Sequence, residues 1–344
     1  MSNTAIVSKA RAMYGRRLTQ SDWEALLACS SVAEAAAYLK SSTAYGSVLN
    51  GINESSIHRG ELEDLLHQRL MQETLRLSRY DLGIGEHTAN YLLGQIEVDQ
   101  ILHAAIRINS HQETDLTPPN PYLNSHTRFD QRLVDQAATF EQLLEAVQGT
   151  RYYKVLLPFR TAEGGMQNYT GLEHALLMDL YTQLYKVIDK ESHGAERTAL
   201  HEMFDDMVDL QNYARIIRLK SYYHVTDSQL RACLLPFGKL PKAKLEQMIA
   251  ADTPAQATAV MATTRLGKRA FQLPYDLPGD LVLQVRYREC HRNIFFSSES
   301  SVVMLSYIFL MQTELNGLIN LIEGLRYGVS KAEIKRLLNP YEFG

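Results

Sequence analysis

Two stretches of similar sequence decide the fold class: SVAEAAAYLKSSTAYGSVL at residues 31–49 and ATFEQLLEAVQGTRYYKVL at residues 138–156. They share the frame E-x8-T-x-Y-x2-V-L at a spacing of 107 residues. The frame makes two pairs of equivalent residues, Thr43 with Thr150 and Tyr45 with Tyr152. Because a catalytic site rarely needs the same threonine and tyrosine twice, the equivalence indicates a structural role. We expect each tyrosine to fill the space between helices, with its hydroxyl donating to a backbone carbonyl.

Further copies of the pattern extend the repeat to the rest of the chain. A weaker copy lies at residues 253–271, where Thr264 stands 114 residues after Thr150. A second repeat, at a spacing of 104 residues, pairs Asn212 with Asn316. Two independent sets at nearly the same period predict three copies of one helical unit. We expect Asn212 and Asn316 to hold a helix crossing through buried amide hydrogen bonds.

The remaining sequence is dominated by helical periodicity. Apolar side chains recur every three or four residues along 62–70, 172–188 and 203–217, which places them on one face of a helix. Helix starts carry capping boxes, in which a hydroxyl residue is followed three residues later by Glu or Gln. The boxes are Ser21/Glu24, Ser31/Glu34, Thr226/Gln229, Thr253/Gln256 and Ser330/Glu333. Long alternation of apolar and polar residues is absent, so the sequence predicts an all-α fold.

Breaks rich in proline and glycine divide the helical pattern. Those at Thr117–Asn120 and Pro236–Pro241 cut the chain into thirds. We therefore predict three helical repeats, at 1–120, 121–236 and 237–344. Helical solenoid repeats are only about 33–47 residues long. Units of this greater length favour pseudo-symmetric packing around an axis, as a funnel or ring.

Composition excludes several classes of protein. The 344 residues carry 35 Lys and Arg against 39 Asp and Glu, a formal charge of −4 that argues against a protein built to bind nucleic acid. Three scattered cysteines without a CxxC pair support neither a zinc site nor a disulfide framework. The N-terminus lacks the apolar core of a signal peptide. The apolar run Val302–Met311 is shorter than the roughly 20 residues of a membrane span, so we expect a core helix without a direct transmembrane span.

No catalytic, cofactor or metal site is predicted. A phosphate-binding loop needs Gly-Lys followed by Ser or Thr, whereas Gly238–Lys239 and Gly267–Lys268 are followed by Leu and Arg. The Glu-x-x-His signature of a di-iron bundle is also missing. Asp205, Asp206 and Asp209 have too few companions for a calcium site, and we expect them on a solvated face.

A run of basic residues follows these aspartates on the same predicted helix. Arg215, Arg218 and Lys220 are candidate contacts for acidic groups of a partner protein. A solvated helix face explains the same run equally well.

Several segments, taken in order, resemble one known family. They are Ala10–Thr19, Thr43–Tyr45, Asp209–Arg215, Ser306–Asn316 and Gly328–Ile334. Their order and spacing over essentially the whole chain are similar to the C subunit of the bacterial and archaeal A/V-type ATPases, which in eukaryotes is called the d subunit. The sequence departs from the family at Gly317–Asn320, where an Asn-x-Arg-like continuation is common.

The resemblance implies a three-lobed, funnel-shaped helical protein in the rotor of a V-type ATPase. Such a protein is non-catalytic and cytoplasmic, attached to the membrane peripherally through the complex. It sits on the membrane proteolipid ring, receives the central-stalk subunits of the ATPase head, and transmits rotation for ATP-linked ion transport. Two alternatives stay open: an all-α threefold scaffold or adaptor of another complex, and an enzyme with a pocket between lobes.

Overall fold

The protein is built from helices joined by loops. A computed structural model describes residues 3–54, 56–80, 84–110, 120–163, 165–223 and 225–338. Within these ranges there is no β-strand, and an isolated bridge pairs Arg160 with Met166. The predicted all-α fold is confirmed. In the predicted break at Thr117–Asn120, residues 117–119 lie outside the described residues.

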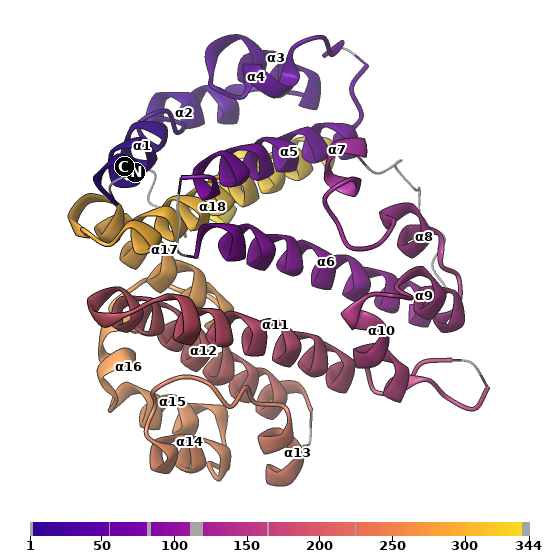
Figure 1. The fold of residues 1–344 in the computed structure, drawn as a ribbon, viewed down its shortest axis with the longest axis vertical. Coiled ribbons are helices and arrows are strands. Elements are labelled where there is room, and N and C mark those ends of the chain that lie inside the picture. Colours follow the sequence, from indigo (N-terminus) through magenta and orange to yellow (C-terminus); the bar gives the residue numbers. More distant parts are fainter. Residues whose placement is uncertain are drawn as a thin grey trace.

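Long helices form the frame of the molecule. They are α1 (Asn3–Tyr14), α5 (Arg59–Ser78), α6 (Gly85–Ser110), α11 (Tyr169–Glu191), α12 (Gly194–Tyr222), α17 (Pro278–Phe296) and α18 (Ser300–Arg326). Three pairs are consecutive in the chain and double back on themselves: α5 with α6, α11 with α12, and α17 with α18. The adjoining ends of the paired helices lie on the same side of the molecule (Figure 1).

Short helices pack in groups against this frame (Figure 1). The first group is α2 (Gln20–Ala28), α3 (Val32–Ser42) and α4 (Gly46–Leu49). The second is α7 (Pro121–Asn124), α8 (Gln131–Gln136), α9 (Phe140–Ala146), α10 (Arg151–Leu156) and the 3-10 helix η1 (Leu157–Phe159). The third is α13 (Asp227–Ala232), α14 (Lys242–Ile249), α15 (Pro254–Ala262) and α16 (Arg265–Ala270), and α19 (Lys331–Leu338) follows α18.

Three apolar cores hold these groups to the long helices. One core joins the two ends of the chain, because α1 to α5 pack with α18 and α19 and with the adjoining ends of the other long helices. A second core holds α8, α9 and α10 between the C-terminal half of α6 and the N-terminal half of α11. A third core holds α13 to α16 against the C-terminal half of α12 and the N-terminal half of α17. The cores thus cross the linear thirds, and the boundaries at 120 and 236 stay a prediction.

The apolar run Val302–Met311 lies inside α18. This helix is long and apolar enough, by length and composition, to cross a membrane, yet 83% of its most apolar window is buried inside the protein. α5, α1 and α17 pack along it. The expected core helix is therefore confirmed.

The predicted helix caps can be compared with the observed ones. At Ser31, Thr226, Thr253 and Ser330 the hydroxyl accepts from the backbone N–H three residues later, as predicted. The cap predicted at Ser21 is wrong. There Thr19 caps α2, because Asp22 accepts from the Thr19 backbone N–H and completes an earlier capping box. Because this box lies at Thr19, the helix starts two residues closer to the N-terminus than predicted.

Candidate functional site

The repeated threonines each join two consecutive short helices. In every case the hydroxyl donates to a carbonyl of the preceding helix and accepts from an N–H of the next. Thr43 donates to the Leu39 carbonyl at 2.6 Å and accepts from the Tyr45 N–H at 3.2 Å. Thr150 donates to the Val147 carbonyl at 2.7 Å and accepts from the Tyr152 N–H at 3.2 Å. Thr264 donates to the Met261 carbonyl at 2.7 Å and accepts from the Gly267 N–H at 2.9 Å. One hydroxyl therefore sets the angle between two helices at each of the three positions.

Tyr45 meets a buried carboxylate on a distant helix. Its hydroxyl donates to Glu314 Oε1 of α18 at 2.8 Å, and the Leu18 N–H donates to Glu314 Oε2 at 2.8 Å. The Arg69 guanidinium lies 3.8 Å from the centre of the Tyr45 ring. The tyrosine is buried between helices as expected, but its hydroxyl binds a carboxylate and not a backbone carbonyl.

Tyr152 repeats this arrangement with Glu97 of α6. Its hydroxyl donates to Glu97 Oε2 at 2.7 Å, and the Arg128 N–H donates to Oε1 at 2.6 Å. The Arg128 guanidinium also pairs with Glu97, and Arg151 lies over the Tyr152 ring. Here too the expected carbonyl acceptor is wrong. An isolated buried carboxylate is costly, so each acid requires donors from several segments, and at both acids a tyrosine hydroxyl and a backbone N–H are among them.

The third core has a different arrangement. Leu266 stands two residues after Thr264, where the other copies have tyrosine. Asp209 of α12 nevertheless accepts from the Lys239 and Leu240 N–H groups at 3.0 and 2.9 Å. Burial, with the nearby carboxylates of Asp205 and Asp206, raises the pKa of Asp209 to about 7 against the effect of those two hydrogen bonds. The burial of Glu97, Asp209 and Glu314 was not predicted. Each of the three is an acidic residue among apolar ones in a helix, and their spacing could have revealed them. Asp209 follows Glu97 by 112 residues, and Glu314 follows Asp209 by 105.

The expected solvated face at Asp205, Asp206 and Asp209 is wrong for two of the three residues. Asp206 and Asp209 are each 3% exposed. Asp206 pairs with Lys239 at 2.9 Å and with Arg269. Lysine and arginine from segments more than 30 residues away cover this face of α12, and short-range charge patterns do not reveal such partners.

The two repeat-equivalent asparagines differ. Asn212 is buried, and its amide exchanges two hydrogen bonds of 2.9 Å with the backbone of Leu235. Asn212 therefore fixes the segment after α13 to α12. The prediction was that it would hold two helices where they cross. Asn316 is exposed on α18, so the predicted buried amide is wrong there. Its neighbours Leu315 and Gly317 are buried, and the helix turns the Asn316 side chain outward.

The basic run on α12 separates into internal and external residues. Arg215 donates to the Cys233 carbonyl at 2.7 Å and pairs with Glu173 at 3.2 Å. Lys220 donates to the carbonyls of Ile249 and Ala251 at 2.7 and 2.6 Å. The Arg218 side chain is 52% exposed, and its nitrogen is 3.7 Å from Glu173. Of the three, Arg218 is the one placed to reach a partner.

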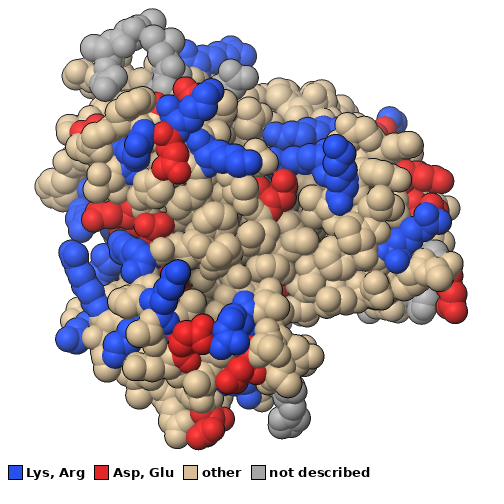
Figure 2. Space-filling view, turned by 60° about the horizontal axis from the view of Figure 1, so that its bottom comes forward, with Lys and Arg blue, Asp and Glu red and all other residues tan. Residues whose placement is uncertain are grey.

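Arg218 borders a large open groove between α11, α12 and the start of α17. The groove has a volume of about 760 Å³. Tyr222 and Leu277, 76% and 62% exposed, stand at its edge. Its apolar lining comes from Leu177, Ile217, Leu235, Val282 and Leu283. Figure 2 shows one face of the molecule, where charged side chains of both signs surround a largely uncharged middle, so no field of a single sign covers that face.

These features define an all-helical protein whose buried polar groups hold distant helices together. Within the described ranges, no three His, Cys, Asp or Glu side chains are grouped to hold a metal ion. The family model for the ATP synthase (C/AC39) subunit matches residues 6–337. The chain therefore belongs to the ATP synthase (C/AC39) subunit family.

Relatives carry the same kind of name at low identity. The C subunit of the A-type ATP synthase of Pyrococcus furiosus is 27% identical over 130 residues, 38% of this chain and 34% of the relative. Its counterpart in Pyrococcus horikoshii is 26% identical over 132 residues, with the same coverage. The counterpart in Pyrococcus abyssi is 20% identical over 230 residues, 64% of this chain and 61% of the relative. The chain thus spans about a third of the length of the first two relatives.

Proposed function

We propose that this chain is a rotor subunit of a V-type ATPase or synthase, a non-catalytic socket between the central stalk and the membrane proteolipid ring. In this role it works in the cytoplasm, attached to the membrane peripherally through the complex, and couples ATP chemistry to ion transport. The observation that carries the proposal is the family match over residues 6–337. The names of the archaeal relatives agree with it.

The arrangement we propose for this role is three pseudo-symmetric helical units around an axis. Three threonine hydroxyls, each bonded to a carbonyl before it and an N–H after it, support it. Buried acids on α6, α12 and α18 support it further, because each accepts from a backbone N–H that lies just before a short helix: Arg128 before α8, Leu240 before α14 and Leu18 before α2. The repeats at 1–120, 121–236 and 237–344 remain the proposed units of sequence, and α18 completes the first unit in space.

A socket under torque must be stiff, because compliance would uncouple the two ends of the machine. Long helices with close-packed cores resist deformation better than loops do. The tyrosine and backbone bonds to Glu97 and Glu314 add cross-links between segments far apart in the chain. We assign these residues to rigidity and none of them to catalysis.

The groove beside Arg218 is the surface we propose for binding a protein of the central stalk. It is open and lined mostly by apolar side chains, with Arg218 and Glu173 among its charged residues, and such a mixture is found in non-permanent protein interfaces. Arg215 lines the groove but is engaged in internal bonds, and Lys220 is bonded elsewhere, so Arg218 supplies the exposed basic charge.

Affinity purification tests the role directly. A tagged chain expressed in its own cells should co-purify the proteolipid ring and the central-stalk subunits. Absence of both would overturn the proposal, and recovery of a different complex would favour the scaffold alternative. At the groove, Arg218→Glu should reduce recovery of stalk subunits and leave the ring bound. Lys190→Glu, at a side chain that is also exposed, serves as the charge-matched control.

A further inference from the structure

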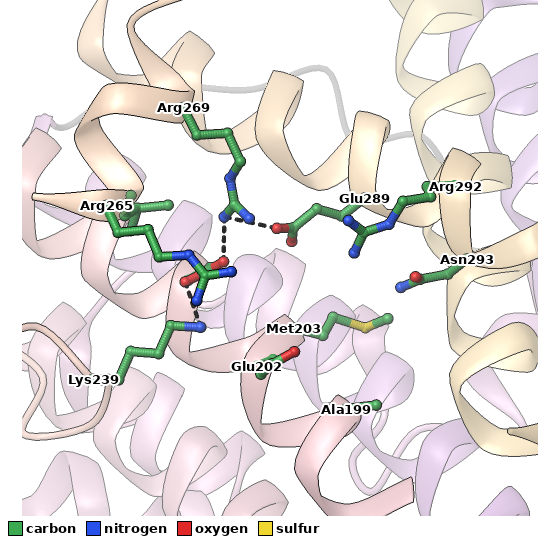
Figure 3. Close-up of a pocket in the computed structure, with 11 residues that line it drawn as sticks. Ala199, Glu202, Met203, Lys239, Arg265, Arg269, Glu289, Arg292 and Asn293 are labelled. Carbon is green, nitrogen blue, oxygen red and sulfur yellow. Dashed lines mark hydrogen bonds and ion pairs between the residues drawn. The ribbon is translucent and has the colours of Figure 1, made fainter. Parts of the chain in front are cut away.

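A second pocket lies away from the groove, between α12, the segment before α14, α16 and α17. Its volume is about 270 Å³. Four basic side chains line it: Lys239, Arg265, Arg269 and Arg292. Figure 3 shows Arg265 and Arg269 on α16, Lys239 in the segment before α14 and Arg292 on α17, all around the same pocket. The proposed rotor role uses none of these residues.

Two of the four bases are already committed to acids in the pocket wall. Asp206 pairs with Lys239 at 2.9 Å and with Arg269, which also pairs with Glu289 at 2.8 Å (Figure 3). This network fixes the floor of the pocket. It also engages the two buried carboxylates, so they are not available as converging catalytic acids.

The other two bases have no such partner. Neither Arg265 nor Arg292 forms an ion pair with any residue that the structure describes, and both side chains are exposed. In Figure 3 their guanidinium groups reach toward the middle of the pocket from opposite walls, α16 and α17. The remaining acid, Glu202, lies on α12 in the figure without a drawn interaction. The pocket therefore presents two guanidinium groups that form no ion pair with the described residues, next to the network of Lys239, Arg269, Asp206 and Glu289. Burial raises the pKa of Glu289 to about 8 although the charges of Arg269 and Arg292 act against that rise, so this carboxyl adds little negative charge near neutral pH.

We propose that this pocket binds a small anion that carries a phosphoryl group. Guanidinium groups present paired N–H donors that match two oxygens of a phosphate. Two such groups on opposite walls contact different oxygens of the same tetrahedral group. Met203 and Leu266 add apolar surface to the lining. Binding here uses side chains, in a chain that lacks a phosphate-binding loop. The proposal is independent of the rotor role.

Binding measurements on the full chain test the site. Isothermal titration calorimetry with inorganic phosphate and with ATP should show binding by the wild type. The double variant Arg265→Gln/Arg292→Gln should weaken binding at least roughly tenfold, as expected for loss of two charged hydrogen bonds. Arg132→Gln, at an exposed arginine of α8 that lines neither the pocket nor the groove, should leave it unchanged. Adenosine, which has no phosphoryl group, should not bind.

The two ligands distinguish the source of the phosphoryl group. Equal affinity for phosphate and ATP identifies a free phosphate site, and tighter binding of ATP identifies a nucleotide site. No binding of either ligand at millimolar concentration would overturn the proposal. Equal binding by wild type and double variant would also overturn it. Circular dichroism of the double variant verifies folding, and ³¹P line broadening gives a second readout on the same samples.

Discussion

Glu97 and Glu314 are held alike although they lie on different helices, α6 and α18. Each accepts from a tyrosine hydroxyl on one oxygen and from a backbone N–H on the other. A buried carboxylate is tolerated only when its oxygens are satisfied in this way. The tyrosines therefore contribute through their hydroxyl as well as through the space they fill.

Tyr152→Phe keeps the ring and removes the hydroxyl, which donates to Glu97 and accepts from Arg151. We expect a loss of about 1.5–3 kcal/mol in the free energy of unfolding, the usual range for a hydrogen bond to a charged group. Urea denaturation measures it. Tyr153→Phe, at the neighbouring half-buried ring, is the matched control and should change stability little. Equal losses in both variants would show that the bond to Glu97 contributes nothing.

Position 238 favours glycine for two reasons: the backbone has a positive φ, and any side chain there would clash with Asp209. Its φ is +100°, and a Cβ there would lie 2.1 Å from Asp209 Oδ1. We expect Gly238→Ala to destabilise by more than the roughly 1–3 kcal/mol of backbone strain alone. Gly328→Ala is the control, because φ is +63° there and nothing lies near the new methyl group. Similar unfolding free energies for the two variants would contradict a steric role for Asp209.

Asp209 also makes stability depend on pH. Burial raises its pKa to about 7 from 3.8, so the folded chain holds a proton that the unfolded chain releases between those values. This group therefore lowers the free energy of unfolding as pH rises from about 4 to 7, by at most about 1.4 kcal/mol per pH unit. Asp209→Asn removes the titration. Urea melts across this interval should show the wild type losing stability relative to the variant; parallel profiles would refute the shift.

At the scale of helices, the threonine junctions explain why the repeat is visible in the sequence. A hydroxyl that caps one helix and bonds the end of the previous one acts within a few residues. The requirement is local, so the same residue type recurs in each copy. The long helices follow the same rule, since α5, α11 and α12 bury the apolar faces predicted from their periodicity.

Thr150→Ala removes both hydrogen bonds at the junction of α9 and α10. We expect a loss of about 1 kcal/mol, as for other N-cap threonines. Thr150→Ser keeps the hydroxyl and should restore most of the stability. Thermal or urea unfolding of the two variants makes the comparison. A serine variant as unstable as the alanine variant would assign the effect to the methyl group instead.

At the scale of the whole molecule, the first core unites the two ends of the chain. Residues of α1 to α5 share it with α18 and α19. Force applied to the first short helices therefore reaches the C-terminal helix directly. This closure makes the N-terminal third dependent on residues that are about 300 positions away.

A fragment of residues 1–120 lacks α18 and should fail to unfold cooperatively. A fragment of residues 85–191 contains every buried residue of the second core and should retain helix and a sharper urea transition. Circular dichroism during urea titration compares the two. A cooperative transition in the 1–120 fragment would instead establish the linear third as a folding unit.

Local interactions explain what the sequence by itself determined. The all-α class, the threonine junctions and the burial of α18 follow from periodicity, capping and apolar content, which act over one or two helical turns. Tertiary structure alone decided the acceptors of Tyr45 and Tyr152, the burial of Asp206 and the exposure of Asn316. Those outcomes depend on which distant segments bring donors to a buried charge, and the energy of a buried charge is set by all of its neighbours at once.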